Sequence, residues 1–231
     1  MNTERLFPFV LWLLAAFVAG SIPFGLILVK LAGKGDVRQQ GSGNIGATNV
    51  MRSGGKVLGI VTLLLDAAKG YLPVFLAARF FASPQESQGM VVLAWIGLAA
   101  VAGHMYTPWL KFQGGKGVAT ALGVCLAYHP LMVVPALGTF IVLVAIFRYV
   151  SLGSVAAAVI LLPAALGMFG PAFSGVDPLF FKLGDPRYLV VAWVLMAGLV
   201  VRKHAANLQR LLKGTESKLF AKKPEAPHGQ A

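Results

Sequence analysis

Long apolar runs separated by short polar loops make up most of this chain, and the pattern predicts helices that cross a membrane. A helix needs about 20 apolar residues to span the bilayer core. Leu6–Leu31, Val57–Phe81 and Met90–Leu110 meet that length. Two later runs, Leu152–Phe169 and Tyr188–Val201, are read as further helices, although the second is short for a span. No segment alternates strongly enough between polar and apolar residues to indicate a strand.

The apolar run over residues 118–147 is expected to break at His129-Pro130. Proline disfavours helix at the residue before it, so the break falls at this pair. A short Gly117–Tyr128 helix, about 18 Å long at 1.5 Å per residue, is left on one side of the break. Leu131–Phe147 follows as the next helix.

The sequence therefore predicts an all-α, polytopic integral membrane protein with seven transmembrane helices, of which the fourth is short. Residues 1–218 are expected to form one seven-helix membrane domain, and residues 219–231 a flexible cytoplasmic tail. Composition agrees, because 57% of the residues are hydrophobic and 12% are charged, whereas an ordinary soluble domain has roughly 25% charged residues. The first apolar run is too long for the core of a signal peptide, so we expect it to remain in the mature protein as a helix.

Basic residues divide unequally between the two sets of loops that alternating helices create. Fifteen Lys and Arg fall on one side, and only Arg5, Arg79, Lys182 and Arg187 fall on the other. Positive charge accumulates on the cytoplasmic side of a membrane, so the N-terminus is expected outside and the C-terminus in the cytoplasm. The net charge of +12 is dispersed between apolar runs, which indicates anionic membrane lipids rather than nucleic acid as a partner.

Three polar loops interrupt the apolar pattern, and all three are predicted to face the cytoplasm. They cover Gly41–Arg52, Lys111–Thr120 and Arg202–Glu216. Glycine-rich turns near Lys and Arg suit phosphate, because bare backbone N–H groups can converge on the anion. Such turns, placed only between apolar runs, indicate phosphorylated substrates handled at a membrane surface.

The first loop contains Gly41-Ser-Gly-Asn-Ile-Gly46, which matches the dinucleotide fingerprint G-x-G-x-x-G. That interpretation requires a preceding strand, and an apolar helix is predicted there instead. The favoured interpretation is a backbone nest for phosphate, to which side chains add neutral hydrogen bonds and a bidentate cation. These side chains are Ser42, Asn44, Thr48, Asn49 and Arg52. A polar turn that caps the next helix is the alternative.

The second loop carries Gly114-Gly-Lys116-Gly117 just before the short fourth helix. It is not a Walker A loop, because Leu110 stands where that motif needs its first glycine. Consecutive glycines at a helix N-terminus still expose N–H groups and a favourable dipole, and Lys116 adds a point charge. A structural hairpin turn is the alternative. His104, ten residues before the first glycine, is read as packed or interfacial rather than catalytic.

The third loop places His204, Asn207 and Arg210 at helical spacing, so that they would share one face of a helix. A histidine near its unperturbed pKa can act as a base or donate a hydrogen bond to phosphate. An amphipathic, basic helix that lies on lipid is the alternative.

Two further polar groups lie outside these three loops. Asp66 and Lys69 are three residues apart inside the second apolar run, and charges buried in a membrane are costly unless they are paired. They are interpreted as a structural ion pair that supports the first loop. Arg148, Ser151 and Ser154 form a small fourth cluster on the predicted cytoplasmic side.

At these loops the sequence resembles the acyl-phosphate:glycerol-3-phosphate acyltransferase (PlsY) family, integral membrane enzymes of bacterial phospholipid synthesis. The resemblance runs nearly end to end and rests on six motifs in order. They are GSIPFG (20–25), GSGNIGATNVMR (41–52), LDAAKG (65–70), GHMYTPWLKFQGGKGVAT (103–120), RYVSLGS (148–154) and RKHAANLQRLLKGTE (202–216). Gln113 departs from the family pattern, which has lysine there, while Lys116 is kept.

The resemblance implies transfer of a fatty acyl group from acyl phosphate to the 1-hydroxyl of sn-glycerol 3-phosphate. The products are 1-acyl-sn-glycerol 3-phosphate (lysophosphatidate) and phosphate. It also implies a seven-helix fold in the bacterial cytoplasmic (inner) membrane, with the active site facing the cytoplasm. The implied partners are the two substrates and membrane lipids, with no cofactor and no metal ion.

The site residues expected from the motifs and from the chemistry of the loops fall into two sets. The catalytic set is His204, Asn207, Arg52 and Ser42. The phosphate-binding set is Gly43, Asn44, Thr48, Asn49, Gly114, Gly115, Lys116, Gly117, Ser154 and Arg210. His204 either acts as the base that takes the proton of the glycerol hydroxyl, or it is, with Asn207, an orienting hydrogen-bond donor while a substrate phosphate takes the proton; the orienting role is favoured.

The residues themselves agree with this chemistry. Acyl phosphate is already activated, so no covalent acyl-enzyme is required, and the chain has no G-x-S-x-G nucleophile elbow. Catalysis then rests on positioning and electrostatics. A transporter of phosphorylated metabolites would place polar groups near the midplane and on both faces, whereas here they concentrate on one face. A lipid-binding anchor would leave the glycine loops unexplained.

Overall fold

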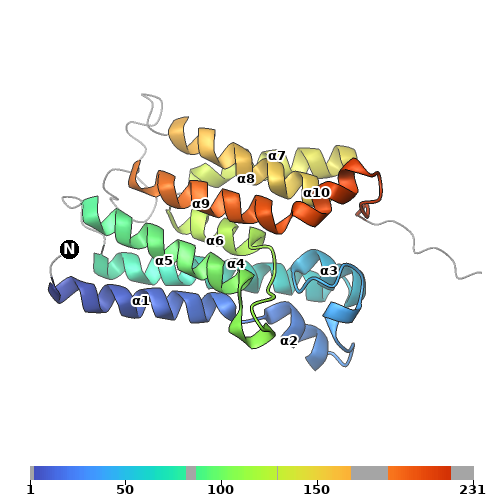
Figure 1. Cartoon of the computed structure of the whole chain (residues 1–231), viewed down its shortest axis with the longest axis horizontal. Coiled ribbons are helices and arrows are strands. Elements are labelled where there is room, and N and C mark those ends of the chain that lie inside the picture. Colours follow the sequence, from blue (N-terminus) through green and yellow to red (C-terminus); the bar gives the residue numbers. More distant parts are fainter. Residues whose placement is uncertain (1–2, 82–86, 129, 168–186, 220–231) are drawn as a thin grey trace, which may run out of the picture.

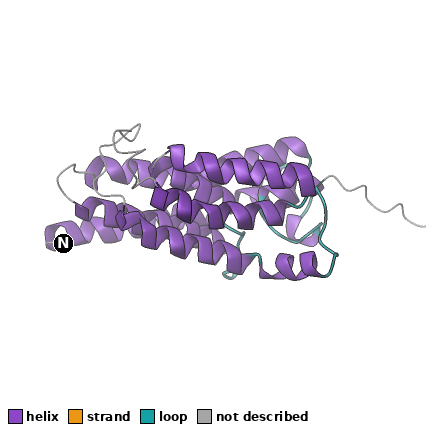
Figure 2. Cartoon of the chain, turned by 90° about the horizontal axis from the view of Figure 1, so that it is seen from above, coloured by secondary structure: helices purple, strands orange, loops and turns teal. Residues whose placement is uncertain are grey.

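The computed structural model describes residues 3–81, 87–128, 130–167 and 187–219. Over these ranges the chain forms helices joined by turns and contains no strand (Figure 1, Figure 2), which confirms the all-α prediction. The α-helices are α1 (Thr3–Ser21), α2 (Phe24–Leu31), α3 (Ala47–Ser53), α4 (Lys56–Phe81), α5 (Ser87–Met105), α6 (Val118–Tyr128), α7 (Pro130–Phe147), α8 (Val150–Gly167), α9 (Arg187–Lys203) and α10 (Ala205–Leu212). Two short 3-10 helices, η1 (Val37–Gln39) and η2 (Pro108–Leu110), lie in the loops.

The long helices run alongside one another, with the short α6 in the middle of the bundle (Figure 1). α1 packs on α5, α4 on α6, and α7 on α8, while α9 contacts both α8 and α5. The predicted break after the short helix is confirmed, because α6 ends at Tyr128 and α7 begins at Pro130. Proline suits the first turn of a helix, where its missing N–H would have had no partner. His129 itself lies outside the described residues.

Glycines let two of these helix pairs approach at backbone distance. A Cβ at Gly20 or Gly103 would overlap a backbone carbonyl of the facing helix in the α1–α5 pair, and a Cβ at Gly70 or Gly123 would do the same in the α4–α6 pair. In lipid, where burial of apolar surface does not drive association, small residues allow helices to pack closely. Close contact between α4 and α6 also fixes the loop that precedes α6 relative to α4.

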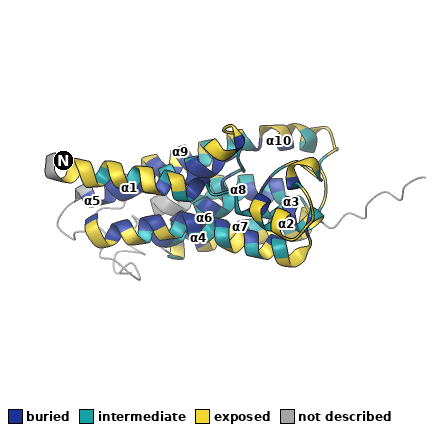
Figure 3. Ribbon diagram, turned by 90° about the horizontal axis from the view of Figure 1, so that it is seen from below, coloured by how far each residue is buried: buried dark blue, intermediate teal, exposed yellow. Residues whose placement is uncertain are grey.

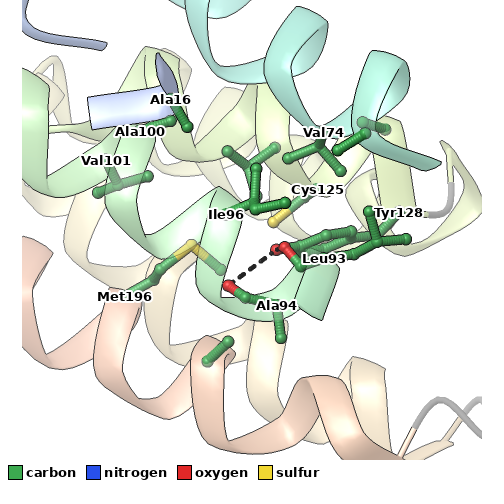
Figure 4. Close-up of a cluster of buried hydrophobic side chains, with 14 of the residues drawn as sticks. Ala16, Val74, Leu93, Ala94, Ile96, Ala100, Val101, Cys125, Tyr128 and Met196 are labelled. Carbon is green, nitrogen blue, oxygen red and sulfur yellow. Dashed lines mark hydrogen bonds between the residues drawn. The ribbon is translucent and has the colours of Figure 1, made fainter. Parts of the chain in front are cut away.

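Apolar side chains fill the interior and also cover much of the outside. Figure 4 shows Val74, Ile96 and Met196, from α4, α5 and α9, gathered in one buried cluster with Tyr128. The Tyr128 hydroxyl donates to the carbonyl of Leu93 at 2.9 Å, so this buried polar group is satisfied. Figure 3 shows exposed positions along the outer faces of the helices, and many of these carry large apolar side chains. Extensive apolar surface of this kind is typical of a membrane contact.

Three stretches of the described chain are long and apolar enough to cross a membrane, namely Arg5–Leu31, Lys56–Phe81 and Gly89–Leu110. They coincide with the first three predicted segments. Shorter apolar helices follow at Val118–Tyr128 and beyond. The count of seven crossings and the direction of insertion stay predictions.

The first predicted segment, Leu6–Leu31, is interrupted between α1 and α2. Pro23 lacks a backbone N–H and cannot continue the hydrogen-bond ladder of α1. The carbonyl of Ile22 accepts a hydrogen bond from Lys69 Nζ at 2.7 Å. A backbone group at membrane depth needs such an internal partner, because lipid supplies none. The break is therefore stabilised by a side chain of α4.

Other boundaries also differ from the predictions. The third segment, Met90–Leu110, ends as an α-helix at Met105 and continues into η2. The first loop contains α3, and the third contains α10, which begins only after His204. Of the predicted tail, Leu219 is described, and its N–H donates to the carbonyl of Arg148 at 2.7 Å. Residues 220–231 lie outside the described residues.

Candidate active site

The described loops gather mainly at one end of the bundle (Figure 2), and residues from them line a cavity of about 1350 Å³. The predicted site residues that line this cavity are Ser42, Asn44, Thr48, Asn49, Arg52, Lys116, Gly117, Ser154, His204, Asn207 and Arg210. They come from all three predicted loops and from α8. Gly43, Gly114 and Gly115 are not part of the lining. Segments more than 150 residues apart in the sequence therefore meet at one site.

The side chain of Asn49 holds the first loop in shape through hydrogen bonds to the backbone of that loop. Its Oδ1 accepts a hydrogen bond from the N–H of Ser42 at 2.8 Å, and its Nδ2 donates to the carbonyls of Asn44 at 2.8 Å and Gln40 at 3.0 Å. The side chain is buried, and its amide atoms are engaged by the backbone of the loop. Asn49 therefore maintains the shape of the loop, and this geometry does not support the direct phosphate contact predicted for it.

Gly43 also shapes the first loop rather than lining the cavity. Its φ is +70°, in the left-handed region that favours glycine, and its N–H donates to the carbonyl of Gln40 at 3.0 Å. The loop is preceded by α2 and η1. The dinucleotide interpretation fails here, because its fingerprint must follow a strand.

The second loop is held against the end of α5 by its glycines. The N–H of Gly114 donates to the carbonyl of Met105 at 3.2 Å, and the N–H of Gly115 donates to the carbonyl of His104 at 3.0 Å. These two N–H groups were expected to bind phosphate. In the structure they donate instead to backbone carbonyls at the end of α5. A Cβ at Gly115 would overlap His104 Nε2. Because Gly115 packs this closely against His104, the next residues, Lys116 and Gly117, lie at the cavity.

A Gly115→Ala substitution is expected to weaken the affinity for the phosphorylated substrates. The added Cβ has no space beside His104, so the loop must shift and carry Lys116 with it. Steady-state kinetics on the purified variant would measure this as a raised KM. Gly138→Ala in α7 is a matched control, because nothing lies within 4 Å of the Cβ it would add. A Gly115→Ala enzyme with the KM values of the control would mean that the loop is a plain turn.

Lys116 connects the second loop to the third. Its Nζ donates to Asn207 Oδ1 at 2.6 Å. Burial lowers the pKa of Lys116 to about 8, so the side chain remains mostly cationic at neutral pH. Its charge lies at the cavity with those of Arg52 and Arg210. Lys56 and Lys218 line the cavity as well, and a cavity bordered by several cations suits anions that carry more than one charge.

His204 is the residue that precedes α10, rather than a member of its helical face. Its side chain is buried, and Nδ1 lies 2.8 Å from the carbonyl of Val200. A carbonyl accepts only, so Nδ1 carries the proton and Nε2 of the neutral ring is an acceptor. Burial lowers the pKa of His204 to about 4. The ring is therefore neutral at physiological pH and suited to accept a hydrogen bond from a hydroxyl, rather than to donate one to phosphate as first considered.

Glu216 is a member of the site for which no role was predicted, although it ends the third motif. Its Oε1 accepts from Ser151 Oγ at 2.8 Å and from Asn207 Nδ2 at 2.7 Å, while Oε2 accepts from Arg210 Nε at 2.8 Å. Burial raises the pKa of this carboxyl, but the hydrogen bonds from Asn207, Ser151 and Arg210 outweigh it and leave the pKa below its usual value. Glu216 thus fixes the amide of Asn207. Its signal in the sequence was an acid in a strongly basic segment.

The same C-terminal segment also contacts the first loop. Arg52 Nη2 donates to the carbonyl of Ser217 at 3.2 Å. Together with the bonds of Glu216, this contact joins α3, α8 and α10 across the cavity. In the fourth predicted cluster, Ser151 and Ser154 line the cavity and Arg148 does not.

The predicted ion pair is confirmed, because Lys69 Nζ lies 2.8 Å from Asp66 Oδ1. Lys69 also supports the break between α1 and α2 through the carbonyl of Ile22, and the expected support of the first loop stays a prediction. His104 is packed, as expected, and both Asp66 and His104 also line the cavity.

Fold and site together define an integral membrane protein with a helical bundle and, at one end, a cavity lined by several cationic side chains. The family model described as glycerol-3-phosphate acyltransferase matches residues 10–214. The chain belongs to this family and is an acyltransferase.

Two curated relatives named glycerol-3-phosphate acyltransferase illustrate the match. The protein from Trichlorobacter lovleyi is 48% identical over 211 residues, which cover 91% of this chain and 97% of that protein. The protein from Geobacter sulfurreducens is 47% identical over 208 residues, covering 89% and 95%.

Solved structures agree with the fold. The crystal structure of PlsY (YgiH), an integral membrane glycerol 3-phosphate acyltransferase, in its glycerol 3-phosphate form matches with a TM-score of 0.76 at 36% identity. The match covers 91% of this chain and 95% of that one. The lysophosphatidic acid form of the same protein matches with a TM-score of 0.75 at 35% identity.

Proposed function

We propose that the chain transfers a fatty acyl group from acyl phosphate to the 1-hydroxyl of sn-glycerol 3-phosphate, giving lysophosphatidate and phosphate. The observation that carries this proposal is the convergence of several cations, among them Arg52, Lys116 and Arg210, on a cavity that His204 and Asn207 also line. Both substrates carry a phosphate, and several cations are needed to hold two phosphates side by side. The glycerol 3-phosphate and lysophosphatidic acid forms of the solved relative support this substrate and product.

The reaction needs no covalent enzyme intermediate. The glycerol hydroxyl oxygen attacks the acyl carbonyl carbon, a C–O bond forms, and the bond from that carbon to the phosphate oxygen breaks. The departing electron pair stays on the phosphate, which also receives the hydroxyl proton. His204 Nε2 accepts a hydrogen bond from the hydroxyl and aims it at the carbonyl. Arg52 and Lys116 balance charge on the phosphates, so catalysis rests on orientation and electrostatics.

The remaining site residues take supporting roles in this proposal. Ser42, Asn44, Thr48, Gly117 and Ser154 border the phosphates at the cavity wall. Asn207 is fixed by Glu216 and directs its oxygen to Lys116. Metal ions and cofactors have no part in the proposed chemistry.

Transfer is tested with purified protein in lipid vesicles, given acyl phosphate and labelled glycerol 3-phosphate. Labelled lysophosphatidate and one equivalent of phosphate are the expected products. Label carried into the vesicle lumen without lysolipid would indicate a transporter. If neither lysolipid formation nor uptake is observed, the result would indicate a lipid-binding anchor. Replacing acyl phosphate with an acyl thioester is the control for the donor, and equal transfer from both donors would contradict the proposed donor.

The membrane arrangement belongs to the same proposal. Residues 1–218 would form one domain of seven crossings in the bacterial inner membrane, with the N-terminus outside and the cavity open to the cytoplasm. The unequal distribution of Lys and Arg between the loops supports this direction of insertion.

Cysteine labelling in intact cells tests the orientation. A cysteine at Ser217, an exposed residue beside the cavity, is expected to resist a membrane-impermeant thiol reagent. A cysteine at Ser174, which lies outside the described residues, is expected to react. The native Cys125 is buried and serves as an internal blank. External labelling at Ser217 would contradict a cytoplasmic site and most of the mechanism with it.

A further inference from the structure

Part of the cavity lining differs in chemistry from its cations. Asp66 of α4 and His104 of α5 line it there and are almost fully buried, with 2% and 4% of their surfaces exposed. Lys69 does not offer its charge to the cavity, because its ammonium is bonded to Asp66 and to the carbonyl of Ile22. A carboxylate and an imidazole are therefore the polar groups that this part of the lining presents.

These two groups leave a hydrogen-bonding position between them. His104 Nδ1 lies 3.7 Å from Asp66 Oδ1, too far for a direct hydrogen bond. Both atoms are buried; Asp66 Oδ1 is held by its ion pair with Lys69, whereas His104 Nδ1 has no hydrogen-bond partner among the described residues. Buried polar atoms in proteins are nearly always paired, so each such exception calls for an explanation. A polar contact longer than about 3.5 Å commonly indicates a third group between the two atoms.

The chemistry of the pair selects the kind of group that fits. Phosphate is repelled by the Asp66 carboxylate and is drawn to the cations elsewhere in the cavity. A hydroxyl carries no net charge, can donate to the carboxylate oxygen, and can accept from an imidazole N–H. An alcohol group of a small phosphorylated polyol gives His104 Nδ1 its missing partner and adds a hydrogen bond to the Asp66 oxygen that Lys69 already holds, while its phosphate remains at the cations.

We propose that Asp66 and His104 form a hydroxyl-binding subsite that recognises the hydroxyl of glycerol 3-phosphate that is not acylated. The proposal rests on the proposed function for the identity of the polyol phosphate. The subsite makes the cavity selective for a substrate with a second hydroxyl, since a ligand without that group leaves the buried His104 Nδ1 without a hydrogen-bond partner. Sites that hydrogen-bond a substrate hydroxyl discriminate strongly against analogues that lack it for this reason.

The second loop lies directly against this subsite. His104 Nε2 packs on Gly115, and the carbonyl of His104 accepts the N–H of the same glycine. Lys116 is the next residue. Recognition of the hydroxyl by His104 and placement of Lys116, a cation for phosphate, are therefore coupled through the backbone of Gly115.

The test compares glycerol 3-phosphate with propane-1,3-diol monophosphate, which keeps the phosphate and a primary hydroxyl but lacks the hydroxyl at C2. With acyl phosphate saturating, the wild type is expected to prefer glycerol 3-phosphate in kcat/KM by about tenfold or more, the range for a hydrogen bond to a charged group. Asp66→Asn is expected to remove most of that preference while the KM for acyl phosphate is unchanged. His104→Gln, which keeps the Asp66–Lys69 pair, is expected to lower it as well.

Two controls separate recognition from folding. Thr62→Val changes a buried side chain one turn away on α4 that bonds only to the carbonyl of Leu58 and does not line the cavity, so the preference should persist. The double variant Asp66→Asn with Lys69→Met removes both buried charges, so no unpaired ammonium destabilises the helix, and it should show the same loss of preference as the single variant.

The subsite is overturned if the wild type uses both alcohols equally, a measurement that needs no variant. It is also overturned if Asp66→Asn or the double variant folds, keeps the KM for acyl phosphate and retains the wild-type preference; that result would mean that the position holds only a structural water. A wild type that acylates neither alcohol would refute the proposed function instead.

Discussion

Replacing His204 with alanine is expected to slow acyl transfer by about 10²–10⁴-fold, the usual contribution of a well-placed acid–base group. The expectation follows from the position of the ring, which Val200 holds by Nδ1 so that Nε2 is left as an acceptor. Without this acceptor the glycerol hydroxyl is no longer aimed at the acyl carbonyl. Gln209→Ala is the matched control, because Gln209 is an exposed residue of α10 that does not line the cavity.

The amide variants decide between orientation and full proton abstraction. An amide oxygen can accept a hydrogen bond but cannot hold the proton, so His204→Asn or His204→Gln should keep much of the rate if His204 only orients the hydroxyl. The pH profile should agree: the pKa of about 4 leaves no His204 ionisation near its usual value of 6.5, and protonation should abolish the acceptor only as the pH falls toward 4. Near-complete loss of rate in the amide variants, with substrate binding intact, would instead establish His204 as the base.

Replacing Lys116 with alanine is expected to lower kcat/KM by about ten- to a hundredfold, since a hydrogen bond to a charged group contributes roughly 1.5–3 kcal/mol. Arg52→Ala should have an effect of similar size, because it removes another cation from the same cavity. Arg38→Ala is the control, because Arg38 pairs with Asp36 and does not line the cavity. Wild-type kinetics in folded variants of both Lys116 and Arg52 would rule out these assignments.

The charge of Lys116 also predicts a pH dependence of a definite sign. The cationic form binds phosphate, and with a pKa of about 8 the cation is lost as the pH rises through that value. Phosphate groups are already fully ionised there, because their second pKa is about 6. The wild type should therefore lose substrate affinity above pH 8, whereas Lys116→Arg should not, because arginine stays protonated. Parallel KM–pH curves for the two proteins would contradict this role of Lys116.

The sequence was most informative where several residues suited to the same chemistry lie within one short segment. Glycines beside Lys116, and His204 followed by Asn207, identified the loops because those residue types are uncommon between apolar runs. The all-α fold and the helix break at Pro130 were likewise predictable, since apolar length and proline act locally.

The parts that could not be predicted depend on contacts between distant segments. Glu216 joins the site through Ser151, which is 65 residues away. Asn49 looked like a phosphate ligand because its type is right, and only the fold shows that its amide is engaged by Gln40 and Asn44. The break between α1 and α2 is satisfied by Lys69, a partner that spacing along the chain does not reveal.

The contact of the C-terminal segment with α3 bears on how the enzyme matures. Ribosomes synthesise Arg52 well before Ser217, yet the two meet at the cavity. During translation the first loop is therefore made and inserted long before its final neighbours exist. A nascent chain has no complete cavity until residue 217 has left the ribosome, so catalytic competence has to wait for that segment.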